Sequence, residues 1–242
     1  MMLVIEYLKK RFSPVKFILL STLLCLFVYD VAASGTNWAK GIFFLFISLF
    51  TFRILDDAGS VYYDRANYPE RTYLKKENYP SFLRFTITIC LGYLLSLFFY
   101  SQAYFLVIAG LMGVSVMGYV FFGKNNFILP IVPLFKYPIL LWCLMSFSSE
   151  TNDLLVALSS LLIIASHDVI ELIGKKDWAH NFGLIILLMV GFMLFPFWTN
   201  KLYLICILIL PLIIYLIRKW KYRAFVPVLY YPIVYFVLTN FS

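Results

Sequence analysis

Two apolar runs decide the fold class of this chain: FLRFTITICLGYLLSLFFY at residues 82–100 and AYFLVIAGLMGVSVMGYVFF at residues 103–122. A run of about 15 to 20 apolar residues has the length that one helix needs to cross the hydrocarbon core of a bilayer. Neither run shows the strict alternation of apolar and polar residues that marks a membrane β-barrel. We therefore expect an all-α membrane protein.

Seven further runs of the same kind extend this prediction to about nine spans. They cover Phe17–Ala33, Gly41–Leu55, Phe127–Phe147, Leu154–Ile170, Phe182–Trp198, Leu202–Ile217 and Phe225–Leu238. Pro130, Pro133 and Pro138 interrupt the third of these runs, because proline breaks the hydrogen bonding of a helix. Hydrophobic residues make up 63% of the 242 residues, more than a water-soluble domain of this size can bury. We expect a single transmembrane helical domain over residues 1–242.

The net charge of +8 would suit a nucleic-acid-binding protein, but the positions of the basic residues explain it better. If the N-terminus is cytoplasmic, all of the 20 Lys and Arg residues except Lys40 and Lys201 fall on the cytoplasmic side. An excess of Lys and Arg on that side is typical of multi-pass membrane proteins. The pattern predicts a cytoplasmic N-terminus, contact with membrane lipid and no nucleic-acid partner.

An acidic segment, RILDDAGSVYYDRANYPER at residues 53–71, begins where the second span should still be in the membrane. On a helix, Asp57, Ser60 and Asp64 fall at positions i, i+3 and i+7 of one stripe, and Asp56 lies beside Ser60. Crowded carboxylates repel one another, and their hard oxygens suit Mg²⁺, which also binds phosphate. The alternative is that these acids simply end a helix and pair with nearby arginines, namely Arg53, Arg65 or Arg71.

A second acidic segment, SHDVIELIGKKDW at residues 166–178, closes the sixth span on the same predicted side. Asp168, Glu171 and Lys175 again fall at i, i+3 and i+7. Carboxylates at membrane depth are costly unless they face water, a partner charge or a metal. Two such stripes can face each other across a cavity, and we expect both to open on the cytoplasmic side.

The two segments together resemble the motifs of the UbiA superfamily of membrane prenyltransferases. The first family motif, N-D-x-x-D-x-x-x-D, is similar to Asp56-Asp57-x-x-Ser60-x-x-x-Asp64, which Asn67, Pro69 and Arg71 follow. The second is similar to Asp168-x-x-Glu171-x-x-x-Lys175. The resemblance implies nine helices around a central cavity, with both motifs on the cytoplasmic side.

In that family the motifs hold the diphosphate of an isoprenoid through Mg²⁺, and the resemblance implies the same chemistry here. The residues it assigns to the metal are Asp56, Asp57, Asp64, Asp168 and Glu171. The residues it assigns to the diphosphate are Ser60, Arg71, Lys136 and Lys175. Ionisation of the carbon–oxygen bond would give an allylic cation that alkylates a small hydrophobic acceptor, for which we expect an aromatic compound.

Asp56 replaces a neutral asparagine of the family pattern, and three further positions depart from it. Ser60 and Lys175 stand where the family usually has aspartates, which removes negative charge, and Glu171 is a longer acid. The expected consequence is one metal ion fewer, or none. Family members often add a tyrosine and a lysine after the fourth helix, and this chain offers Tyr119 with Lys124, or Lys136. The segment LFK at residues 134–136 enters an apolar run as the family lysine does, which favours Lys136.

Two other functions use the same features. A terpene cyclase on this scaffold would ionise the isoprenyl diphosphate and let a double bond of the substrate attack the cation, without an acceptor. A non-catalytic protein or a transporter would bind a lipid diphosphate and leave it intact, and the substitutions at Ser60 and Lys175 favour this alternative.

Overall fold

A computed structural model describes residues 2–68, 70–122, 132–148, 154–172, 185–186, 189–190 and 226–241 of the chain. The chain divides into two compact units, each with its own internal packing. Unit one comprises Met1–Leu19 and Phe43–Lys136, and unit two comprises Leu20–Ile42 and Tyr137–Ser242. All of the residues that form the candidate site described below belong to unit one.

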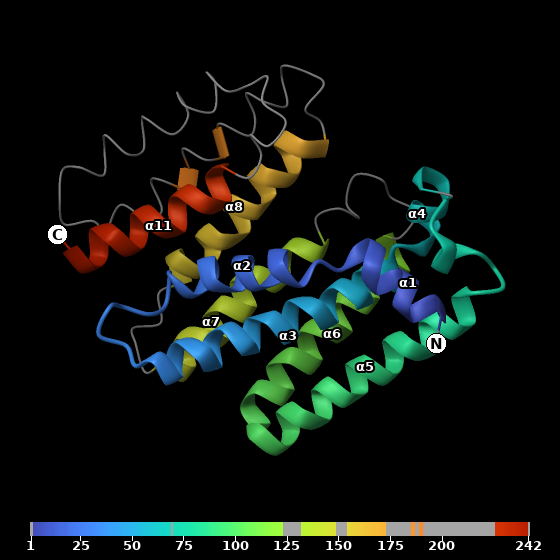
Figure 1. Cartoon of the computed structure of the whole chain (residues 1–242), viewed down its shortest axis with the longest axis horizontal. Helices are drawn as coiled ribbons and strands as arrows, with labels where there is room; N and C mark the ends of the chain where they lie inside the picture. Colours follow the sequence, from blue (N-terminus) through green and yellow to red (C-terminus); the bar gives the residue numbers. More distant parts are fainter. Residues whose placement is uncertain are drawn as a thin grey trace. The chain divides into compact units, whose positions relative to one another are not determined.

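The described residues form helices and no strands (Figure 1). The α-helices are α1 Met2–Arg11, α2 Pro14–Cys25, α3 Gly35–Gly59, α4 Val61–Asn67, α5 Tyr79–Tyr100, α6 Gln102–Phe122, α7 Lys136–Ser148, α8 Leu154–Leu172 and α11 Val226–Phe241. Two 3-10 helices, η1 Thr72–Leu74 and η2 Val132–Phe135, precede α5 and α7. The expected all-α fold is confirmed for this part of the chain.

Three of the described helices are long and apolar enough to cross a membrane, and they cover Gly35–Gly59, Tyr79–Tyr100 and Gln102–Phe121. Shorter apolar helices cover Pro14–Cys25, Leu154–His167 and Val226–Asn240. The spans expected at 182–198 and 202–217 fall, except for two short fragments, outside the described residues. These features fit a membrane protein, as the apolar runs predict.

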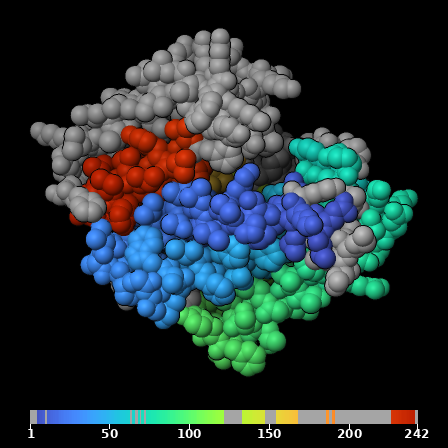
Figure 2. Space-filling model, viewed as in Figure 1, coloured from blue at the N-terminus to red at the C-terminus, as the bar shows by residue number. Residues whose placement is uncertain are grey.

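Helices α5 and α6 form a hairpin that turns at Ser101 (Figure 1). The turn is compact, because the Ser101 N–H donates to the Leu97 carbonyl at 2.7 Å. Large apolar side chains on both helices are exposed, among them Phe99 at 80% and Val120 at 75%. Atoms of this hairpin, coloured green, lie at the surface in Figure 2. An exposed apolar face of this kind is typical of a surface that lipid or another protein covers.

Three predicted spans differ from the observed helices by more than three residues at an end. The first span is expected to reach Ala33, but α2 ends at Cys25, and the chain turns there so that Tyr29 packs against Trp38 with ring centroids 5.5 Å apart. The second span is expected at Gly41–Leu55, but α3 begins at Gly35 and continues to Gly59, where its acids have buried partners. The fifth span is expected over Phe127–Phe147, of which residues 127–131 lie outside the described residues, η2 covers Val132–Phe135 and α7 covers Lys136–Ser148.

An aromatic cluster packs α1 against the other helices of unit one. Tyr7 of α1 packs edge-on against Tyr73 of η1, with ring centroids 5.2 Å apart, and against Phe82 of α5 at 4.9 Å. Ile54 and Ala58 of α3 are buried in the same cluster. Burial of aromatic rings is among the largest apolar contributions to packing, so this cluster holds α1 beside the C-terminal end of α3.

Candidate functional site

The first acidic segment does not continue as one regular helix, which corrects the prediction of a single uninterrupted stripe. Helix α3 ends at Gly59, Ser60 lies in a turn, and α4 begins at Val61. Backbone hydrogen bonds cross this break, from the Ser60 N–H to the Asp56 carbonyl at 2.8 Å and from the Asp64 N–H to the Ser60 carbonyl at 2.9 Å. The three aspartates therefore stay near one another although they belong to two helices.

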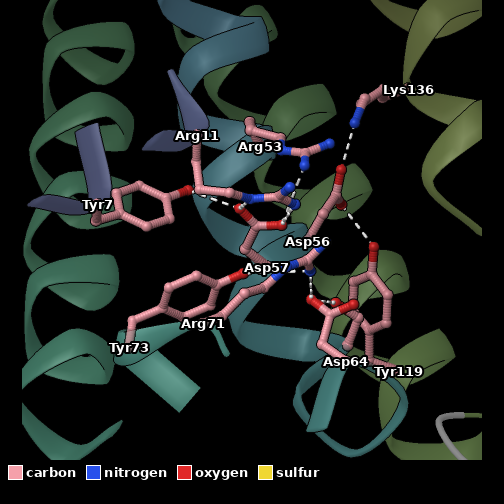
Figure 3. Close-up of polar contacts among 11 residues, drawn as sticks. Tyr7, Arg11, Arg53, Asp56, Asp57, Asp64, Arg71, Tyr73, Tyr119 and Lys136 are labelled. Atoms are coloured by element: carbon pink, nitrogen blue, oxygen red, sulfur yellow. Dashed lines mark hydrogen bonds and ion pairs between the residues drawn. The ribbon is translucent and has the colours of Figure 1, made fainter. Parts of the chain in front are cut away.

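Asp57 is 3% exposed and is held by three side chains (Figure 3). Arg11 forms a bidentate contact with Asp57, since Nη2 donates to Oδ1 at 2.8 Å and Nε donates to Oδ2 at 3.3 Å. The Tyr7 hydroxyl donates to Oδ2 at 2.9 Å. Arg53, one helical turn before Asp57, places Nη2 at 3.4 Å from Oδ1. Two arginines and a tyrosine thus neutralise and orient this carboxylate.

Asp56 is 7% exposed and faces a different pair of side chains. The Tyr119 hydroxyl of α6 donates to Oδ1 at 2.6 Å. The Lys136 ammonium, at the start of α7, donates to Oδ2 and is itself buried. The contact joins residues 80 positions apart in the chain, so it ties the end of α3 to Lys136, the last residue of unit one.

Asp64 of α4 completes the set of buried carboxylates at 5% exposed. The Arg71 Nη1 lies 2.6 Å from its Oδ2, and the Ser60 hydroxyl donates to the same oxygen at 3.2 Å. Arg71 also lies over the Tyr68 ring, 3.8 Å from the centroid, which fixes the direction of its guanidinium. Burial raises the pKa of Asp64 above its ordinary value, although the charge of Arg71 acts in the opposite direction.

Three groups from α1 and η1 keep their protons, namely the Tyr7 and Tyr73 hydroxyls and the Arg11 guanidinium. Burial raises the pKa of Tyr7 far above its ordinary value, and the neighbouring Asp57 charge adds to this shift. Burial also raises the pKa of Tyr73 to about 12. Burial alone would lower the pKa of Arg11, but the hydrogen bonds and charge of Asp57 raise it overall. Tyr7 and Arg11 therefore act as hydrogen-bond donors to Asp57 and not as bases. The Tyr73 hydroxyl accepts from Arg71 Nη1 at 3.5 Å.

The structure brings six of the predicted site residues into one cluster. They are Asp56, Asp57, Ser60, Asp64, Arg71 and Lys136. Asp168 and Glu171 lie in the last turns of α8, but their side chains lie outside the described residues, as does Lys175 entirely. Lys124, the alternative to Lys136, is outside the described part as well.

The alternative interpretation of the first acidic segment predicts that its acids pair with Arg53, Arg65 or Arg71, and two of these three arginines do so. Arg53 pairs with Asp57, and Arg71 pairs with Asp64. Arg65 instead donates through Nε to the Leu74 carbonyl at 2.7 Å and lies 5.4 Å from the centroid of the Tyr79 ring. Arg65 therefore connects α4 to the segment before α5, and among the described residues it forms no ion pair with the acids.

Tyr7 and Arg11 are the functional candidates that the sequence analysis misses. The charge pattern places Arg11 among the basic residues of the cytoplasmic side and assigns it no contact. The available signal is their spacing, because residues at i and i+4 share one face of a helix, and α1 spans Met2–Arg11. Lys9, between them in sequence, is exposed on another face.

Magnesium fits the chemistry of these donors but not their arrangement in unit one. Carboxylate and hydroxyl oxygens are the ligands that Mg²⁺ prefers. Within the described ranges, however, no three His, Cys, Asp or Glu side chains gather closely enough to hold a metal ion. Each of the three aspartates instead contacts at least one basic side chain. The described residues by themselves therefore do not fit a magnesium ion.

Gly59 lets the Tyr119 ring lie directly against the end of α3. A Cβ atom at Gly59 would overlap with that ring, coming within 2.8 Å of Cε2 and closer still to two other ring carbons. We expect Gly59→Ala to displace Tyr119 from Asp56 and to destabilise the protein by about 1–3 kcal/mol, as overpacking does. Thermal unfolding of the detergent-purified protein measures the effect.

A matched control for this prediction is Gly92→Ala on α5, where an added Cβ would meet no atom within 4 Å. This change is expected to be neutral or to stabilise the helix by up to about 1 kcal/mol, because alanine has the higher helix propensity. Equal melting temperatures for the two variants would contradict the tight contact between Gly59 and Tyr119.

Chemically, the site combines three buried carboxylates with four basic side chains and two phenols at the end of an apolar helix. In comparisons with known proteins, the chain matches no family model, no curated protein and no solved structure. Its function is therefore inferred from the residues of this cluster.

Proposed function

We propose that the chain is a membrane prenyltransferase that ionises an isoprenyl diphosphate and transfers the prenyl group to a small, aromatic acceptor. The observation that carries the proposal is the buried cluster in which Asp56, Asp57 and Asp64 meet Arg11, Arg53, Arg71 and Lys136. Buried charges at the end of an apolar helix are costly and mark functional sites in membrane proteins. The similarity of this segment to the first UbiA motif supports the same activity.

The chemistry of the leaving group gives the basic residues a role. Cleavage of the carbon–oxygen bond places the bonding electrons on the diphosphate, whose negative charge grows as the bond breaks. Fixed positive groups in a site of low dielectric stabilise such charge where it develops. Arg11, Arg53 and Lys136 lie around the two carboxylates at the end of α3 and supply that charge.

The apolar helices give the isoprenoid tail a compatible environment. Helix α3 is long and apolar enough to cross a membrane, and it carries Asp56 and Asp57 within its last turn. A substrate with a charged head and a hydrocarbon tail suits this arrangement, because the head can meet the cluster while the tail stays among apolar groups. We further propose the nine-span topology with a cytoplasmic N-terminus, on the basis of the charge pattern.

The test is an assay of the purified protein with geranyl, farnesyl or geranylgeranyl diphosphate and magnesium, with and without 4-hydroxybenzoate. Diphosphate release that needs the acceptor, together with a prenylated acceptor in the mass spectrum, is the expected result. Release without acceptor and a cyclic hydrocarbon product would favour the cyclase. Binding of the substrates without any release would favour a non-catalytic lipid-diphosphate protein.

Asp57→Asn is expected to lower the rate of diphosphate release by about 100-fold or more, because the carboxylate that orients Arg11 and Arg53 loses its charge. The variant keeps the shape of the side chain, and gel filtration is the check that it remains folded. Lys9→Gln removes one charge from an exposed position of the neighbouring α1 and should keep the wild-type rate. Full activity in Asp57→Asn would rule out a catalytic role for this cluster.

A further inference from the structure

Basic side chains outnumber carboxylates in the cluster. Asp56, Asp57 and Asp64 are all less than a tenth exposed. Four cations contact them, and these are Arg11, Arg53, Arg71 and Lys136. Among the described residues the cluster therefore has one positive charge in excess, whereas a site built only to collect metal ions needs an excess of negative charge.

Both oxygens of Asp56 and of Asp57, and one oxygen of Asp64, already accept from side chains of the cluster. Arg11 occupies both oxygens of Asp57, while Tyr119 and Lys136 occupy one oxygen each of Asp56. A divalent ion would have to displace buried, charge-assisted hydrogen bonds that are among the stronger polar contacts in proteins. In the described part of the chain the acids thus hold the basic groups in place and do not form a metal cage.

Arg53 has donor capacity left over. Its one ion pair, to Asp57, is long at 3.4 Å, and its Nε is buried without a hydrogen-bond partner among the described residues. At the same time its side chain is 37% exposed, so a ligand can reach it. A guanidinium carries five N–H donors in a planar fork that matches the oxygens of a phosphate.

We infer that this chain binds the diphosphate group directly through guanidinium and ammonium groups, with Arg53 as a main contact, and that binding does not require a divalent metal ion. The inference rests on the proposed function and specifies how its substrate is held. The loss of acidic residues at Ser60 and Lys175 agrees with it, because both changes remove a carboxylate from the motifs. The diphosphate supplies the negative charge that the cluster lacks.

Isothermal titration of the full-length protein in a neutral detergent with inorganic pyrophosphate tests the inference, once with magnesium and once with EDTA. We expect dissociation constants within about tenfold of each other in the two conditions, since one charged hydrogen bond corresponds to about that factor. Binding only with magnesium would overturn the inference and leave the prenyltransferase proposal intact. No binding in either condition would remove both.

Arg53→Gln is expected to weaken pyrophosphate binding in EDTA by about 10- to 100-fold. Arg84→Gln is the matched control, because Arg84 is an exposed arginine of α5 outside the cluster, and it should bind as the wild type does. Equal affinities of the two variants would overturn the role of Arg53. The wild-type comparison with EDTA decides the metal question even if Arg53→Gln fails to fold.

A membrane lipid headgroup carries phosphate too, so a third arm distinguishes the two sources. The titration is repeated after the addition of phosphatidylglycerol to the detergent. If the lipid headgroup does not compete for the site, the dissociation constant for pyrophosphate should stay within about threefold of its value without lipid. This result supports a diphosphate site, because a change below tenfold corresponds to less than about 1.4 kcal/mol. Complete displacement by the lipid would identify a headgroup site and overturn the inference.

Discussion

Lys136→Met is expected to destabilise the protein by about 3–5 kcal/mol, the largest loss of any single change in the cluster, because it leaves Asp56 buried without its cation. Lys136 and Asp56 are both 7% exposed, so water does not replace the lost ammonium. Tyr119 alone cannot neutralise the carboxylate, since a phenol provides a hydrogen bond but no charge. Thermal unfolding in detergent measures the loss as a melting temperature lower by ~10 °C.

The double variant Asp56→Asn with Lys136→Met isolates the ion pair. Asparagine keeps an oxygen that accepts from Tyr119 but carries no charge, so the buried charge disappears together with its partner. We expect the double variant to be more stable than Lys136→Met alone, with a coupling of at least about 1 kcal/mol. Lys9→Met, at an exposed position, serves as the control. Equal instability of the single and double variants would show that Lys136 acts through packing and not through its charge.

The helical fold follows from the sequence because apolar length alone specifies a membrane helix. The predicted run at 82–100 corresponds to α5 and the run at 103–122 to α6, each within three residues at either end. Prediction fails where tertiary contacts decide the end of a helix. Helix α3 runs four residues beyond the apolar stretch, since Asp56 and Asp57 are neutralised by partners from other elements.

The residues of the site that lie within one short segment of the sequence can be predicted from it. Spacing along one helix identifies Asp56, Asp57 and Asp64, and the family resemblance singles out Lys136. Whether these acids form a metal site depends on the side chains around them. The spacing of the acids does not specify which cations from distant segments of the chain contact them. Arg11 lies 46 positions from Asp57, and its contact depends on how Tyr7 packs α1 into unit one.

If the proposed function holds, Arg11→Gln is expected to lower kcat/KM for the isoprenyl diphosphate by about 100-fold or more, because a partly buried positive charge beside Asp57 is lost. The protein should stay folded, since Asp57 keeps Tyr7 and Arg53 as partners. Steady-state measurement of diphosphate release gives the rate. Lys9→Gln removes the same charge from an exposed position of α1 and should leave kcat/KM unchanged.

Arg11→Lys separates the charge of Arg11 from its geometry. Lysine restores the positive charge but not the bidentate contact, in which Nη2 and Nε donate to different oxygens of Asp57. We expect an intermediate kcat/KM, about tenfold below the wild type, because one of two charged hydrogen bonds is lost. Wild-type activity in Arg11→Lys would mean that charge alone is sufficient. Wild-type activity in Arg11→Gln would mean that α1 borders the cluster without acting on the substrate.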